Sequence, residues 1–142
     1  MKIIETREAK GPALDWLVTT AQGLDHFIAY GKVYVRKPGF DDPDEPFYGA
    51  YHYSPSGFWS QGGQIIDQEK ITTHCFDGVW IAVIFERSSW GIPKRREEPV
   101  GGLFGEFVVA ASAFGFDSIE AAMRAYVVSK FGDKVSIPEE LL

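Results

Sequence analysis

The stretch DSIEAAMRAYVVSKFG, Asp117–Gly132, predicts an amphipathic helix from 118 to 131. Asp117 is typical of a helix N-cap, and Glu120 three residues later completes a pattern that resembles a capping box. Gly132 is typical of the residue that ends a helix. Apolar residues recur at helical spacing and predict one buried stripe, formed by Ile119, Ala122, Met123, Tyr126 and Val127.

The stretch VWIAVIFE, from Val79 onwards, gives the strongest strand prediction. Its first seven residues leave no polar face, which is typical of a buried strand at the centre of a sheet. The Asp77-Gly78 pair before it predicts a hairpin turn to a strand in 70–76. Further strands are predicted in 2–6, 26–36 and 103–114, the second as one bent strand or two short ones because Gly31 interrupts it.

A second helix is predicted over 12–22, since Pro12 is tolerated in a first helical turn and Gly23 is typical of a helix end. The chain therefore has a helix near each end, with strands, turns and long loops between them. This order predicts an α+β fold. We expect one domain, 1–142, with a mainly antiparallel sheet and both main helices packed on one face of it.

Composition restricts the classes of function. The formal net charge is −6, with 20 acidic against 14 basic residues. Nucleic-acid binding is therefore not expected, because it needs a basic surface. The first residues lack the apolar run of a signal peptide, and we find no apolar segment long enough to cross a membrane. We expect a cytoplasmic protein without a cofactor. The aromatic content of 15% favours either a core of large side chains or a contact surface.

The reactive residue types do not form a site in the sequence. Cys75 follows His74, but neighbours in a strand point to opposite faces, so they are not a nucleophile and its base. The remaining histidines, His26 and His52, are too widely spaced to suggest a metal site. The acidic stretch 41–45 lacks the spacing of a calcium loop. We therefore assign no catalytic residue and no metal ligand.

The chain resembles the NinX-like family of small phage and prophage proteins in three blocks: GPALDWLVTTAQG (11–23), YSPSGFWSQGGQIID (53–67) and SIEAAMRAYVVSKFGDKVSIPEELL (118–142). The second block is the most specific and resembles the family pattern Y-S-P-S-x-x-W-x-Q-G-G-x-I-I. It departs from the usual S-T-D-W, because the chain reads Ser56-Gly57-Phe58-Trp59 and lacks the acid. The resemblance implies a phage origin and the cytoplasm of a bacterial host cell, without implying an activity.

The segment Tyr53–Gly63 carries the main candidate site. Its proline and glycines shape turns, Trp59 offers a stacking plane, and Gln61 offers a hydrogen-bonding amide. These features fit either a recognition loop or an Ω-loop whose tryptophan fills the core. We expect an ordered loop with Trp59 packed against the body, and with Gln61, Ser56 and Tyr53 facing outward. The candidate binding residues are Tyr53, Ser54, Ser56, Trp59, Gln61, Gly62 and Gly63, with Arg124 and Lys130 across from them on the last helix.

Three functions remain open at this point. The leading hypothesis is a non-enzymatic phage accessory protein that binds a host or phage protein through an aromatic surface. The alternative is a small-molecule or nucleotide-binding module that uses Tyr53–Gly63. The third is a hydrolase or transferase whose catalytic residues follow no recognised pattern.

Overall fold

The computed structural model describes residues 1–96 and 107–142. The helices in this part of the chain are α1 (Gly11–Ala21), α2 (Trp59–Gln68) and α3 (Ser118–Phe131), with short 3-10 turns η1 (Thr6–Glu8) and η2 (Glu139–Leu141). The strands are β1 (Lys2–Glu5), β2 (His26–Ala29), β3 (Lys32–Arg36), β4 (Ala50–His52), β5 (Thr72–Phe76), β6 (Val79–Phe85), β7 (Val109–Gly115) and β8 (Lys134–Ile137). The α+β class is confirmed.

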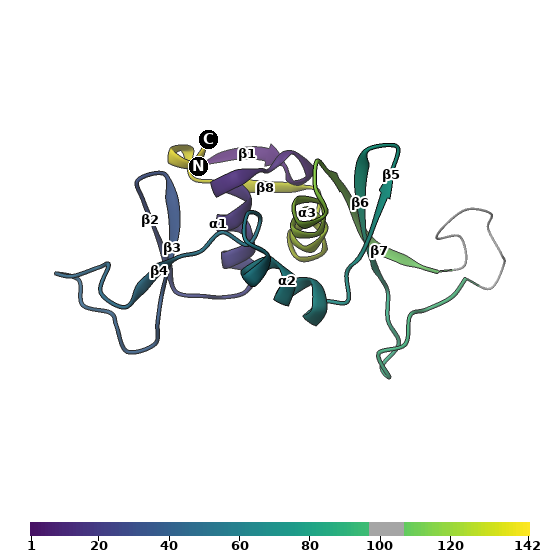
Figure 1. Cartoon of the computed structure of the whole chain (residues 1–142), viewed down its shortest axis with the longest axis horizontal. Helices are drawn as coiled ribbons and strands as arrows, with labels where there is room; N and C mark the ends of the chain where they lie inside the picture. Colours follow the sequence, from purple (N-terminus) through teal and green to yellow (C-terminus); the bar gives the residue numbers. More distant parts are fainter. Residues whose placement is uncertain (97–106) are drawn as a thin grey trace.

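Helix α3 lies at the centre of the molecule (Figure 1). Its bounds agree with the sequence prediction, and the Asp117 carboxylate accepts a hydrogen bond of 2.8 Å from the backbone N–H of Glu120. The prediction of a single buried stripe is too narrow. Ala121, Ala125 and Val128 are also buried, because α1, α2 and the strands β5–β7 all contact this helix.

The strands form three small antiparallel sheets, β1-β8, β2-β3-β4 and β5-β6-β7. The expectation of one main sheet with both helices on one face is therefore wrong. Helix α3 contacts β5-β6-β7, whereas α1 contacts α3 and β3. Helix α2 separates the sheet β2-β3-β4 from the sheet β5-β6-β7, and the sequence predicted only a loop at this position.

Strand β6 is central in its sheet, as predicted, with β5 and β7 on either side. Asp77 and Gly78 both have positive φ, 50° and 77°, which is the backbone of the predicted two-residue turn. Burial is confined to the middle of β6, because Val79 at its start is 44% exposed. The last strand begins at Val109, and 103–106 of its predicted range lie outside the described residues.

The stretch 26–36 folds into two strands, so the second of the two readings is confirmed. Tyr30 and Gly31 form the turn with positive φ values of 52° and 67°. Val33 and Val35 point to the buried side of β3, the strand that α1 contacts. The residues between them in β3 point to the opposite side, because side chains alternate along a strand.

The molecule is elongated, with β2-β3-β4 at one end and β5-β6-β7 at the other (Figure 1). Strands β1 and β8 pair, so the two ends of the chain lie side by side. Within residues 1–96 and 107–142, no helix has the length and apolar character needed to cross a membrane.

Candidate functional site: an aromatic face anchored by a buried aspartate

The candidate segment Tyr53–Gly63 is a turn followed by a helix, which corrects the predicted loop. The backbone N–H groups of Gly57 and Phe58 both donate to the carbonyl of Ser54, and α2 begins at Trp59. Gly62 and Gly63 lie inside that helix without positive φ. Two adjacent glycines have poor helix propensity, and for this reason no helix was predicted here from the sequence.

Asp15 of α1 holds this turn in place. Its side chain is only 3% exposed. Its Oδ2 accepts from the Ser54 hydroxyl at 2.7 Å, and its Oδ1 accepts from the backbone N–H of Ser56 at 2.9 Å. Burial raises the pKa of Asp15, while these hydrogen bonds and the nearby His52 oppose the shift. The sequence analysis did not single out Asp15, although an acid between Leu14 and Trp16 on the second turn of a packed helix was a usable signal.

Gln61 fastens the other side of the turn. Its Oε1 accepts from the backbone N–H of Ser54 at 2.7 Å, and its Nε2 donates to the carbonyl of His52 at 3.2 Å. Tyr53 is buried, and its hydroxyl donates to Oε1 of Gln22 at 2.6 Å. Burial raises the pKa of Tyr53 to about 12. The prediction that Gln61 and Tyr53 face outward is therefore wrong, because both are bonded to the body of the protein.

Trp59 is 60% exposed, so the prediction that it is packed against the body is also wrong. Trp59 is the first residue of α2, and Ile65 of that helix fills the core instead. The two cations expected across from the segment have their described contacts with other residues. The Arg124 guanidinium donates to the carbonyls of Ala9 and Phe114. Lys130 is exposed, with its Nζ 5.5 Å from the centre of the Tyr126 ring.

These contacts reverse the expected order of two substitutions. Gln61→Ala removes both hydrogen bonds to the turn and should lower the free energy of unfolding by about 1–3 kcal/mol, since a half-buried N–H loses its acceptor. Trp59→Ala should change that free energy by less than about 0.5 kcal/mol, as is usual for exposed positions. Urea unfolding of the two variants measures both values. A tryptophan variant less stable than the glutamine variant would contradict this assignment.

An unbroken series of aromatic side chains crosses the outer side of β2-β3-β4. Strand register places Phe27 beside Tyr34, and Tyr34 beside His52. The Phe27 and Tyr34 rings are stacked with centres 5.5 Å apart, and the Tyr34 and His52 rings lie 5.8 Å apart. His52 then meets the edge of Phe58, also at 5.8 Å. The residue Phe58 stands where the resemblance led us to expect an acid.

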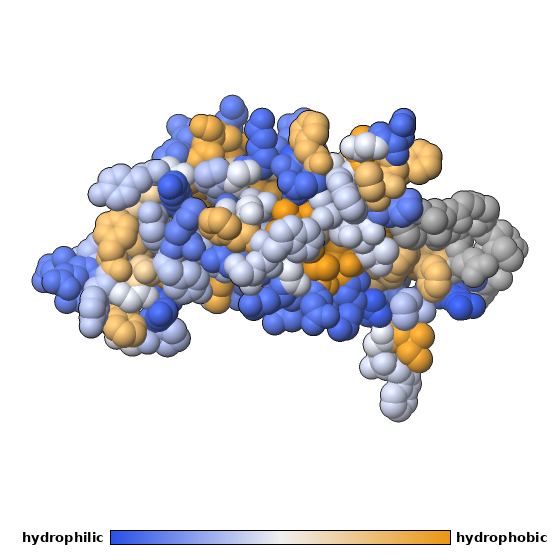
Figure 2. Space-filling view, in the orientation of Figure 1, coloured by the Kyte–Doolittle hydropathy of each residue, from blue (hydrophilic) through white to orange (hydrophobic). Residues whose placement is uncertain are grey.

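The β3–β4 loop adds to this series. Phe47 packs on Tyr34, with ring centres 5.3 Å apart, and Tyr30 stacks on Phe47 at 6.0 Å. Tyr30 is 86% exposed. Figure 2 shows apolar residues over β2–β4, over the β5–β6 hairpin and near the middle of the face in view. We use the name aromatic face for Phe27, Tyr30, Tyr34, Phe47, His52 and Phe58.

The surroundings of the aromatic face are mainly acidic. The β3–β4 loop carries the exposed acids Asp41, Asp42, Asp44 and Glu45. The Arg36 guanidinium lies 4.5 Å from the centre of the Phe27 ring and forms an ion pair with Asp25 at 2.9 Å. Its charge is thereby largely compensated. The exposed Lys32, on the same side of β3 as Tyr34, and the exposed Lys37 add positive charge, but the acids outnumber them. The face therefore combines exposed rings with a border of net negative charge.

The reactive residues lie apart from this face, except for one histidine. Cys75 is exposed and unpaired, and the prediction that it has no catalytic role is untested. His52 belongs to the aromatic face, whereas His26 contacts Trp16 with ring centres 6.2 Å apart. Among residues 1–96 and 107–142, no three His, Cys, Asp or Glu side chains gather closely enough to hold a metal ion.

The fold and the site define a small α+β protein that presents preformed aromatic rings on one sheet. The family model described as "Bacteriophage P22, NinX" matches residues 5–97, more than half of the chain, and the protein belongs to this family. No curated protein matches the chain. The matched range contains the first two resembling blocks, which the Asp15–Ser54 hydrogen bond joins in space. The third block lies beyond the range.

Proposed function

We propose that this phage protein is a non-enzymatic accessory protein of the host cytoplasm, and that it binds a host or phage protein through the aromatic face. The observation that carries the proposal is the series of ring contacts from Tyr30 to Phe58 on an exposed sheet. Aromatic side chains dominate the energetics of protein interfaces. Rings that already pack on one another lose little conformational freedom when a partner binds, which favours affinity.

The acidic border indicates the chemistry of the partner. Asp41, Asp42, Asp44 and Glu45 would attract a basic surface and repel an acidic one. The partner we propose therefore offers apolar or aromatic side chains flanked by lysine or arginine. The negative border and the net charge of −6 disfavour nucleic acid. The alternative of a nucleotide site in Tyr53–Gly63 has less support, because the Ser54 hydroxyl and the Gln61 amide are engaged in internal hydrogen bonds.

A double variant tests the role of the face without disturbing the fold. Tyr30 has positive φ, which asparagine tolerates. Phe58 is the N-cap residue of α2, and its side chain makes no capping hydrogen bond. Serine is favourable at an N-cap because its hydroxyl can accept such a bond. Tyr30→Asn/Phe58→Ser should keep wild-type stability and lose at least about tenfold in partner affinity, as interface aromatics often contribute more than 1 kcal/mol each.

The control removes two rings of similar exposure from the other end of the molecule. Phe116 is 92% exposed and Trp90 is 87% exposed, and neither belongs to the aromatic face. We expect the wild type and Trp90→Ser/Phe116→Ser to capture the same protein from phage-infected cells. We expect the face variant not to capture it. Affinities of the captured protein, measured with purified components, quantify the loss. Equal capture by all three baits would refute binding through this face.

A further inference from the structure

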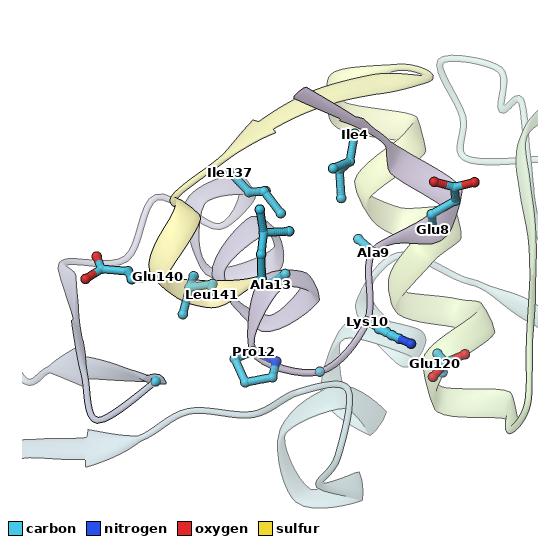
Figure 3. Close-up of a pocket in the computed structure, with 13 residues that line it drawn as sticks. Ile4, Glu8, Ala9, Lys10, Pro12, Ala13, Glu120, Ile137, Glu140 and Leu141 are labelled. Atoms are coloured by element: carbon cyan, nitrogen blue, oxygen red, sulfur yellow. The ribbon is translucent and has the colours of Figure 1, made fainter. Parts of the chain in front are cut away.

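A cavity of about 770 Å³ opens where β1, the start of α1, β8 and η2 meet (Figure 3). Its floor is apolar and includes Ile4, Ala13, Ile137 and Leu141. The volume lies in the range of ligand-binding pockets, about 300–1,000 Å³. The floor is therefore suited to a hydrocarbon chain.

Charged side chains line the rim unequally. Glu120 pairs with Arg124 at 2.9 Å, and Figure 3 places Lys10 beside Glu120 at one end of the pocket. Glu140 lies at the opposite end, where Figure 3 shows its exposed carboxylate directed outward from the apolar floor, and it has no partner among the residues that the structure describes. Glu8 adds another exposed carboxylate to the rim. The Glu140 end is consequently negative, whereas at the Lys10 end the charges are largely compensated.

The pocket adjoins the turn that carries one residue of the aromatic face. Gly31 lines it, and the preceding residue Tyr30 stacks on Phe47. Both residues belong to the turn between β2 and β3, which is shared by the pocket and the face. A partner seated on the aromatic face at Tyr30 would thus lie close to the pocket.

We propose that this pocket receives a basic side chain, arginine or lysine, of the protein that binds the aromatic face, an inference that rests on the proposed function. The methylene stem lies on the apolar floor, and the cationic head lies at the Glu140 end, away from Lys10. Long basic side chains commonly bury their stems on apolar surface while the charged head stays near water. The negative rim disfavours an acidic or phosphorylated side chain.

The test uses n-butylguanidinium as a probe, with n-butylurea as its neutral counterpart and pentanoate as an anion of similar size. In a methyl NMR titration of the full chain, butylguanidinium should shift the signals of Ile4, Ile137 and Leu141 saturably. Butylurea should bind about two- to fivefold more weakly, the effect of one solvent-exposed ion pair. Pentanoate should bind more weakly still. Equal binding of the urea, stronger binding of pentanoate, or no saturable shift at these methyls would overturn the proposal.

Two matched variants locate the cation. Glu140→Gln should weaken butylguanidinium binding about two- to fivefold. Glu139→Gln changes the same charge one residue away from the lining, where the carboxylate lies 3.8 Å from the exposed N-terminal ammonium, and it should leave binding nearly unchanged. Equal effects of both variants would contradict a site at Glu140. Phe58→Ser should bind the probe like the wild type. If the face variants lose partner binding but the wild type does not bind the probe, the pocket proposal alone is refuted. If the wild type binds the probe but the face variants keep partner binding, the proposed function alone is refuted.

Discussion

Asp15→Ala should lower the free energy of unfolding by about 2–4 kcal/mol, because it removes the charged acceptor of two hydrogen bonds. The Ser54 hydroxyl and the Ser56 backbone N–H would both lose their partner between α1 and the turn before α2. Relief of the desolvation that raises the pKa of Asp15 offsets part of this loss. Equilibrium unfolding in urea at neutral pH measures the change.

A control separates the anchor from a general effect of charge. Asp67→Ala also removes a carboxylate, but its side chain is exposed and its ion pair with Lys70 is long, at 3.9 Å. This variant should remain within about 0.5 kcal/mol of the wild type. Asp15→Asn should fall between the wild type and the alanine variant, since the amide oxygen can still accept one of the two bonds. An alanine variant as stable as Asp67→Ala would show that Asp15 does not anchor the turn.

The parts of the fold that the sequence predicted correctly carry local signals. The cap Asp117 and the stop Gly132 lie within or next to α3 itself, and the Asp77-Gly78 turn lies between the two strands that it joins. Such signals depend on neighbours in sequence, so they can be recognised without knowledge of the rest of the chain. The division of the strands into three sheets depends on contacts between distant segments, and no local pattern encodes it.

The candidate segment illustrates the same limit at the level of a site. Its residue types indicated an ordered segment, but Gln61 is bonded to the body of the protein and Trp59 is exposed, the reverse of their expected positions. The decisive partner of Ser54 is Asp15, thirty-nine positions earlier in the sequence. A glutamine that holds a buried turn and one that awaits a ligand have the same appearance in a sequence, because only the position of the acceptor or donor distinguishes them.

Only the amino-acid composition indicated the aromatic face in advance. An aromatic content of 15% was equally consistent with a core of large side chains. The core around α3 consists largely of alanine, valine, leucine and isoleucine, whereas Tyr30, Phe47 and Phe58 are exposed. Small residues in the core allow close packing of helices and strands, so the large rings are left for the surface.

Gly62→Ala should destabilise the protein and Gly63→Ala should not, although the two glycines are adjacent in one helix. A Cβ on Gly62 would collide with the backbone carbonyl oxygen of Pro55 and would lie 2.7 Å from Cδ1 of Ile119. The carbonyl belongs to the turn that Asp15 fixes, so it cannot move aside cheaply. We expect a net loss of about 2–3 kcal/mol, near the upper end of the usual cost of overpacking.

A Cβ on Gly63 would meet only Cε3 of the exposed Trp59, at 3.5 Å, which is ordinary van der Waals contact. Alanine is favoured over glycine inside a helix by about 1 kcal/mol, so Gly63→Ala should be as stable as the wild type or more stable by up to that amount. Urea unfolding of the two variants under identical conditions gives both signs. Because each substitution adds the same methyl group to the same helix, their difference isolates the close approach of α2 to the Pro55 turn and to α3. Equal stabilities would mean that this contact is loose, and the turn that supports Phe58 at the edge of the aromatic face would then need another anchor.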